Sequence, residues 1–190
     1  MIDRKKQILD AAEDLLQTRS FSSFSYQDLS DRLGIRKASI HHHFATKQAL
    51  GVALTKRFLE NRKARLANIE QESGNPWTRL DAYFQYGDEM LEKGRICPTG
   101  ILQAEFNVLP EPIREGERQL FSTNIAWLSD VLADGRAKNV MSFSGTPIDQ
   151  AGLIIAAFQG AIQNGRSSGK AQYHAVIRQL KDSITVKPEL

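Results

Sequence analysis

The sequence predicts an all-α protein with about nine helices. Apolar residues recur every three or four positions along most of the chain, as they do on the buried face of an amphipathic helix. Glycine and proline fall between these periodic segments, at places where helices begin and end. No segment alternates apolar and polar residues as a half-buried strand does.

Three short helices are expected at the N-terminus. An apolar stripe predicts the first one, and its members are Ile8, Ala11, Ala12, Leu15 and Leu16. Phe21 and Phe24 follow among serines and can fold back onto the same core. Ser25 is the expected N-cap of the second helix, which Gly34 ends in a left-handed conformation. The third helix is predicted from about Arg36 to His43.

Longer helices are expected after this point. Thr46 should cap a fourth helix that ends near residue 73, and Pro76 fits the first position of a fifth helix that ends near Gly94. A shorter apolar segment, 101–109, lies between two prolines. The remaining segments are predicted as a helix over 111–137, a loop over 139–145, and two helices over 147–168 and 170–184.

Length and composition limit the classes of protein that the chain can belong to. A chain of 190 residues allows one or two domains, and 41% hydrophobic with 25% charged residues is ordinary for a globular protein. No apolar run approaches the ~20 residues that a bilayer span requires. The polar N-terminus shows no export signal, and the single cysteine, Cys97, cannot form an internal disulfide. A cytoplasmic protein is therefore expected.

The net charge of +3 conceals an uneven distribution. Residues 1–66 contain 13 Lys and Arg against 7 Asp and Glu, a surplus of +6. Residues 67–190 contain 12 against 15, a balance of −3. Because phosphate binding needs local positive charge, a basic first third favours an interaction with nucleic acid there.

Residues 25–47 predict a helix-turn-helix, in which two short helices are joined by a tight turn at Gly34. The outward positions of its second helix bear hydrogen-bond donors and no acidic or bulky aliphatic side chain. In such motifs the N-terminal residues of the second helix reach base edges, while the first helix crosses the DNA backbone. The expected DNA-binding residues are Ser25, Gln27, Arg36, Lys37, Ser39, His41, His42 and Lys47.

At these residues the chain resembles the TetR/AcrR family of bacterial repressors. The family pattern is a valine or isoleucine followed by Ser-Lys-Gly-Thr-Leu-Tyr-x-x-Phe-x-x-Lys. It stands here as Ile35-Arg-Lys-Ala-Ser-Ile-His-His-His-Phe-Ala-Thr-Lys47, and the upstream Ile8–Ala12 and Leu50 fit as well. The resemblance covers about the first 55 residues.

The resemblance implies roles for single residues. Lys37, Ser39 and His42 fall on positions that contact bases or phosphates, and Lys47 falls on a phosphate-binding lysine. His41 stands where the family has a tyrosine whose hydroxyl holds a backbone phosphate. The resemblance also implies a helical C-terminal domain that binds a small-molecule effector and forms a homodimer.

Two other interpretations of the motif are weaker. The three consecutive histidines, 41–43, lie ~100° apart on a helix, so at most two of them could share a metal ion, and no metal site is expected. A packing unit without affinity for DNA would explain the apolar positions but not the outward face of donors.

The middle helices are rich in aromatic residues, which either form a core or line an effector pocket. The residues expected to line such a pocket are Phe58, Tyr83, Tyr86, Met90, Phe106, Asn124, Trp127 and Gln159. Cys97 is either a redox sensor, as in some members of the family, or a small buried hydrophobic residue. No cofactor is expected, and the sequence does not identify the effector.

Small residues recur every four positions at Gly152, Ala156 and Gly160, which allows another helix to approach closely. The partner is either a helix of the same chain or a second copy of the protein. Together with neighbouring positions of the last helix, the stripe resembles half of a four-helix dimer interface; these positions are Ala175, Val176, Gln179 and Leu180.

These observations predict a DNA-binding domain over residues 1–50 and an effector-binding and dimerisation domain over 51–190. The predicted function is a transcriptional regulator, a repressor that a ligand releases from a pseudo-palindromic operator. No Gly-rich phosphate loop, Ser/His/Asp grouping or HExxH motif indicates an enzyme. The rivals are a small-molecule carrier or enzyme with an incidental helix-turn-helix, and an activator or architectural protein.

Overall fold

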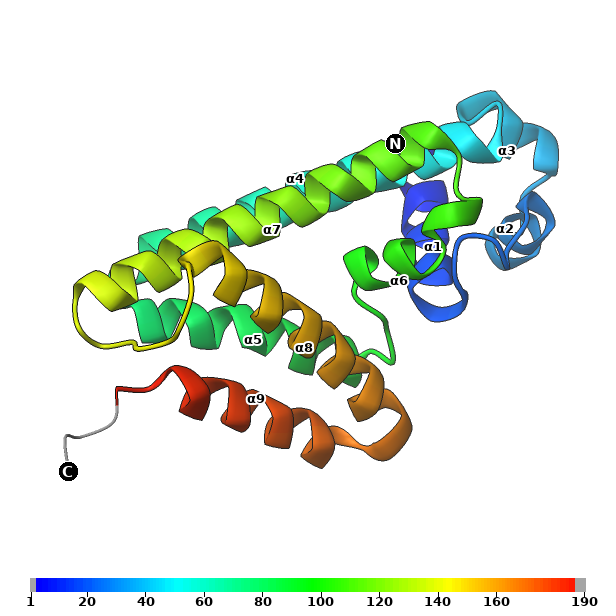
Figure 1. The fold of residues 1–190 in the computed structure, drawn as a ribbon. Helices are drawn as coiled ribbons and strands as arrows, with labels where there is room; N and C mark the ends of the chain where they lie inside the picture. The colour runs from blue at the N-terminus through cyan, green and yellow to red at the C-terminus, as the bar shows by residue number, and fades with distance from the viewer. Residues whose placement is uncertain (1–2, 187–190) are drawn as a thin grey trace. The chain divides into compact units, whose positions relative to one another are not determined.

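The structure, a computed structural model, describes residues 3–186 and is all-α over that range (Figure 1). Its elements are α1 (Arg4–Arg19), α2 (Tyr26–Leu33), α3 (Lys37–His43), α4 (Lys47–Glu72), α5 (Pro76–Glu92), α6 (Pro98–Ala104), the 3₁₀ helix η1 (Phe106–Val108), α7 (Glu111–Ala137), α8 (Pro147–Ser168) and α9 (Lys170–Ile184). The only β contact in this range is a single bridge between Met141 and Thr185. The predicted fold class is confirmed.

Local capping signals set the helix boundaries. The Ser25 hydroxyl accepts from the backbone N–H of Asp28, and the Asp28 carboxylate accepts from the Ser25 N–H at 2.7 Å, a complete capping box. Gly34 ends α2 in the left-handed conformation, with φ 62° and ψ 34°. The Thr46 hydroxyl accepts from the N–H of Ala49 at 3.0 Å and caps α4. The apolar segment predicted at 101–109 is divided into α6 and η1.

The chain forms two compact units. The first extends to Arg62 and also contains Arg95–Leu120, whereas the second contains Lys63–Gly94 and the chain from Phe121 onward. We call these the first unit and the second unit. Each is formed from two separate stretches of chain, so the compact units do not follow a single cut near residue 50. The predicted division by function, DNA binding before residue 50 and effector binding after it, stays a prediction.

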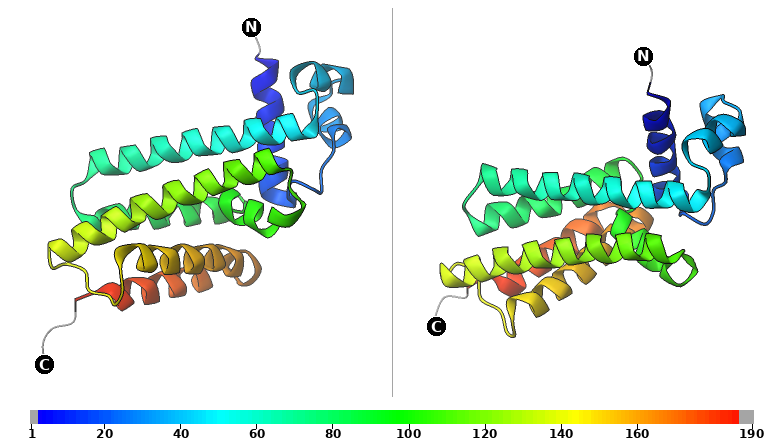
Figure 2. Two further views of the ribbon diagram at one scale, coloured as in Figure 1. Left: turned by 45° about the horizontal axis from the view of Figure 1, so that its top comes forward. Right: turned by 90° about the horizontal axis from the view of Figure 1, so that it is seen from above.

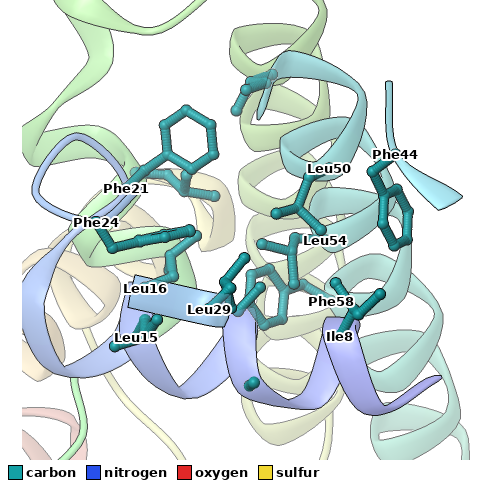
Figure 3. Packing of buried hydrophobic residues seen from close by; sticks show 14 of the residues in the cluster. Ile8, Leu15, Leu16, Phe21, Phe24, Leu29, Phe44, Leu50, Leu54 and Phe58 are labelled. Atoms are coloured by element: carbon teal, nitrogen blue, oxygen red, sulfur yellow. The ribbon is translucent and has the colours of Figure 1, made fainter. Parts of the chain in front are cut away.

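The core of the first unit lies among α1, α2, α3, α4, α6 and the first half of α7. Figure 3 shows its apolar side chains pointing toward one another from α1, α2 and α4. Gly51 permits close packing in this core, because a Cβ there would lie 2.3 Å from the Ile113 Cδ1 atom and 2.9 Å from the Phe21 ring. A glycine in the second turn of α4 therefore meets a packing requirement that outweighs its low helix propensity.

The second unit is built around α8 and α9, which lie side by side and pack against α5 (Figure 2). Its aromatic core includes Phe158, whose ring lies 5.2 Å from that of Tyr83 and 5.7 Å from that of Phe84. The buried Tyr173 hydroxyl donates to the backbone carbonyl of Phe84, which ties α9 to α5. None of the helices described is both long and apolar enough to span a membrane.

Candidate nucleic-acid interface

Buried side chains fix α3 against α2 in a helix-turn-helix. Leu29 and Ile40 are completely buried between the two helices. The Tyr26 hydroxyl donates to the Phe44 carbonyl at 2.8 Å, which holds the end of α3 against the start of α2. In the turn, the Ile35 N–H donates to the Ser30 carbonyl at 3.2 Å. The predicted motif is therefore present, with its angle set by packing at both ends.

The outward face of α3 is made of hydrogen-bond donors. Arg36, Lys37, His41 and His42 are exposed, and Ser39 is half-buried at the edge of the face. Within residues 3–186, neither Arg36 nor Lys37 forms an ion pair with a carboxylate. The positive charge of these two side chains is therefore not neutralised by the protein and remains available to an external anion.

The histidines of α3 differ in their surroundings. Nδ1 of His41 lies 3.1 Å from the Ala45 carbonyl oxygen, and its ring packs edge-on against Tyr26 with centroids 4.8 Å apart. A carbonyl only accepts, so this hydrogen bond requires the proton on Nδ1. The rings of His42 and His43 lie edge-to-face at 5.2 Å. In the described part of the chain, no three His, Cys, Asp or Glu side chains form a possible metal-binding group.

Ser25 and Gln27 lie at the exposed start of α2, where both side chains already have partners. The Ser25 hydroxyl donates to the Asp28 carboxylate at 2.6 Å as part of the capping box. The Gln27 amide donates to the Asp31 carboxylate at 2.5 Å. Both residues are therefore on the surface at the start of α2, and their contact with DNA stays a prediction.

Lys47, the first residue of α4, has its ammonium group over two aromatic rings. Nζ lies 4.8 Å from the ring centroid of Phe21 and 4.7 Å from that of Phe24, within cation–π range. Burial lowers the pKa of Lys47, and the charges of Glu105 and Asp28 act in the opposite direction. Sequence reasoning predicted a phosphate-binding lysine here but missed this aromatic support.

Residues 95–105 contact the helix-turn-helix region at several points, which sequence reasoning also missed. Arg95 donates to the Asp14 carboxylate at 2.8 Å, and Asp14 also accepts from Arg32 of α2. The Ile96 N–H donates to the Gln17 carbonyl at 2.9 Å. The Glu105 carboxylate accepts from the backbone N–H groups of residues 21 and 22. These contacts join residues about eighty positions apart, and no local sequence pattern signals them.

The predicted effector residues fall into both compact units. In the second unit, Tyr83 and Trp127 stack with centroids 5.7 Å apart and an interplanar angle of 16°. Trp127 is 8% exposed, and its indole N–H forms no hydrogen bond with the described residues. Asn124 and Met90 are also buried.

The other predicted effector residues have less distinctive surroundings. Tyr86 and Gln159 are half-buried in the second unit, and the Tyr86 ring lies 5.1 Å from the Arg65 guanidinium carbon. In the first unit, Phe58 belongs to the hydrophobic core, and the half-buried Phe106 lies beneath the Arg118 guanidinium at 5.3 Å. Cys97 is 5% exposed at the start of α6. The roles proposed for all these residues stay predictions.

The small residues of α8 are on an open face of the second unit. Ala156 and Gly160 are exposed, and a Cβ added at Gly160 would meet no atom within 4 Å. Leu153, on the same helix, is 58% exposed. On α9, Gln179 is exposed and Ala175 and Val176 are half-buried, whereas Leu180 is buried. The stripe at Ala156 and Gly160 is therefore not explained by packing within this unit.

Comparison with known proteins finds a matching family model for the N-terminal region and a relative that covers most of the chain. Residues 8–54 match the sequence model of the family described as bacterial regulatory proteins, tetR family. The HTH-type transcriptional repressor NemR of Escherichia coli K12 is 31% identical over 163 residues, which cover 84% of this chain and 82% of NemR.

Solved structures extend the similarity to nearly the whole fold. A TetR-family transcriptional regulator from Agrobacterium tumefaciens superposes with a TM-score of 0.92 at 32% identity, covering 96% of this chain and 97% of that chain. The reduced form of E. coli NemR gives 0.83 at 29% identity, covering 99% and 100%. These similarities confirm the predicted family, the N-terminal helix-turn-helix with a helical C-terminal region, and a DNA-binding regulator in place of an enzyme. The chain belongs to the TetR family of bacterial transcriptional regulators.

Proposed function

We propose that this protein is a repressor that occupies a pseudo-palindromic operator as a homodimer and leaves it when a small-molecule effector binds. The observation that carries the DNA-binding part is the exposed donor face of α3, on which Arg36 and Lys37 have no carboxylate partner in the described residues. The relative NemR is named a transcriptional repressor, which supports repression over activation.

The proposed contacts divide into two kinds. Arg36 and Lys37 begin the recognition helix, where side chains reach the guanine acceptors O6 and N7 in the major groove. Ser39 and His42 can donate to bases or phosphates. Lys47, with Ser25 and Gln27 at the start of α2, would bind the phosphate backbone. Phosphate contacts position the protein, and base contacts determine which operator it selects.

A homodimer is proposed through the exposed face of α8 together with α9. The open surface at Gly160 and the exposed Leu153 on the same face support a partner helix there. Sedimentation should find a dimer at micromolar concentration. Gly160→Leu should produce a folded monomer, because the added side chain overfills a close helix crossing.

The matched control for the dimer is Arg166→Leu. It adds the same side chain to an exposed position about 120° around the α8 axis from residue 160. This variant should remain dimeric. A monomeric wild type, or a Gly160→Leu variant that dimerises normally, would contradict the proposed interface.

An effector site is proposed in the second unit at Tyr83 and Trp127. The buried indole N–H of Trp127 forms no hydrogen bond with the described residues, and a ligand that presents an acceptor to it would satisfy this donor. An effector weakens operator binding only by its differential affinity for the two states, typically about 5- to 150-fold. Trp127→Phe, which keeps a ring and removes the N–H, should reduce the response to effector and leave effector-free operator binding unchanged.

The decisive experiment is a binding titration on the promoter region of the protein's own gene at several salt concentrations. A repressor should bind tightly, and its affinity should fall steeply as salt rises, since phosphate contacts release counterions. A carrier or enzyme would show no such binding. A reporter fused to the same promoter separates repression from activation, and an architectural protein would bind without responding to any metabolite. Because operators lie on the chromosome, we also propose a cytoplasmic location.

A further inference from the structure

Glu105, between α6 and η1, accepts hydrogen bonds from the turn that precedes the helix-turn-helix. Its Oε2 atom accepts from the Phe21 N–H at 2.7 Å, and its Oε1 atom accepts from the Ser22 N–H at 3.1 Å. These are charge-assisted hydrogen bonds to two consecutive backbone donors. The residue lies outside the matched family segment 8–54, so the recognised DNA-binding segment depends on a group from elsewhere in the chain.

The turn held by Glu105 has a strained backbone. Ser20, directly before the gripped residues, has φ 99° and ψ 162°. Ser20 and Asn139 are the non-glycine residues with positive φ in the described part of the chain. Such a conformation persists only where surrounding contacts impose it. The two hydrogen bonds to Glu105 begin at the next residue and are positioned to impose it.

The same turn carries the aromatic rings beneath Lys47. Phe21 and Phe24 are both buried and pack edge-to-face, with centroids 5.9 Å apart. Each ring contacts the Lys47 ammonium. Within residues 3–186 no carboxylate forms an ion pair with this ammonium, although Glu105 and Asp28 are close enough to act on it electrostatically. Lys47 is thus supported by the turn without being neutralised.

We propose that Glu105 is a positioning residue for DNA binding: it holds the turn at residues 20–22 and thereby the aromatic support from which Lys47 contacts a DNA phosphate. The inference rests on the proposed function for the identity of that contact. It connects Glu105 to the operator through the backbone of the turn, the two aromatic rings and the Lys47 ammonium.

The first test compares Glu105→Ala with Glu105→Gln. The alanine variant loses both acceptors, and operator affinity should fall about tenfold, the equivalent of one charge-assisted hydrogen bond. The glutamine variant keeps one acceptor oxygen and should lose less. Glu60→Ala is the matched control, because it removes the same charge from an exposed α4 residue of the first unit. The operator affinity of the Glu60→Ala control should stay equal to that of the wild type or rise slightly above it.

The second test asks whether Glu105 acts through Lys47. Lys47→Ala should lower the slope of log affinity against log salt by about one unit, the signature of a lost phosphate contact. Glu105→Ala should lower the slope in the same direction, although it removes a negative charge. In the Lys47→Ala background, Glu105→Ala should cost little more. Independent, additive losses with an unchanged salt slope would overturn the inference.

The third test begins with hydrogen exchange, which needs no DNA and therefore separates this inference from the proposed function. Hydrogen exchange of the Phe21 and Ser22 amides should accelerate in the Glu105→Ala variant of the full chain and remain unchanged in the Glu60→Ala control. Ser20→Gly should restore operator affinity to Glu105→Ala, because glycine adopts positive φ without strain. Unchanged exchange at both amides would overturn the proposal even if wild-type operator binding is normal. If exchange accelerates in Glu105→Ala as expected but the wild type binds no operator, the proposed function is contradicted and the role of Glu105 in holding the turn is not.

Discussion

The basic residues of the first unit form two groups that a count of charges does not distinguish. Around α1, the side chains of Arg32, Arg57 and Arg95 each pair with a carboxylate of that helix. On α3, Arg36 and Lys37 are exposed and form no ion pair among the described residues. The charges of the first group are neutralised by carboxylates of the protein itself, and these ion pairs stabilise the unit. The second group keeps its charge for an external anion, so pairing distinguishes a structural charge from one that can bind DNA.

The largest expected effect separates the two groups by function. Lys37→Ala and Arg36→Ala should each weaken specific operator binding by about 1–3 kcal/mol, if the side chain contacts a guanine, and should relax the preference for that base. Thermal unfolding should be unchanged, because no contact within the protein is lost. Fluorescence anisotropy on the operator and on single-base variants measures both quantities. Unchanged affinity in both variants would place DNA recognition elsewhere.

The reverse outcome is expected at the centre of the paired group. Asp14→Asn removes the carboxylate shared by Arg32 and Arg95, and should lower the free energy of unfolding by about 1 kcal/mol. Operator affinity should change little at a temperature where the variant is folded. Urea denaturation gives the first quantity and anisotropy the second. Glu60→Gln is the control, because its exposed partner Lys56 lies at 3.9 Å. A variant as stable as wild type would show that these ion pairs are not structural.

A smaller effect should appear in acid. Burial alone would raise the pKa of Asp14, but the hydrogen bond from Arg95 and the charge of Arg32 outweigh it and hold this pKa below its ordinary value of 3.8. The stabilisation is therefore complete above that value, and it is lost as the pH falls through the lower pKa of the folded state. The stability difference between wild type and Asp14→Asn should shrink between pH 6 and pH 3. A constant difference would mean that the pKa of Asp14 is the same in the folded and unfolded states, so that its ion pairs do not stabilise the fold.

The sequence predicted the parts of the fold that depend on neighbouring residues. The capping residues Ser25 and Thr46, the left-handed Gly34 and the helix-initiating Pro76 act within about four positions of themselves. Their effect is therefore visible in a short stretch of sequence. The donor face of α3 was predictable for the same reason, since helical spacing alone determines which side chains share a face.

The missed features depend on residues far apart in the chain. Glu105 meets the Phe21 N–H across 84 positions, and Gly51 is required by the Ile113 side chain of another helix. A glycine inside a helix pattern or a glutamate after an apolar segment has many local explanations. Only the packed structure shows which atoms approach them. The exposed face of α3 was therefore predictable from the sequence, but the long-range contacts that hold the region in place were not.

The discontinuous first unit has a consequence for building hybrid sensors. The simplest exchange of a DNA-binding domain between two regulators would cut the chain once, after the helix-turn-helix. Here such a cut would omit Ile101, Leu102 and Leu109, which complete the apolar core of the first unit. It would also omit Glu105, which accepts hydrogen bonds from the turn at residues 20–22. A transplant of this unit should therefore carry two segments, 1–62 and 95–120, and join the host's chain at three junctions: after residue 62, before residue 95 and after residue 120. Because α6 belongs to the first unit, a substitution at Ile101 or Leu102 also changes the core against which the helix-turn-helix is packed.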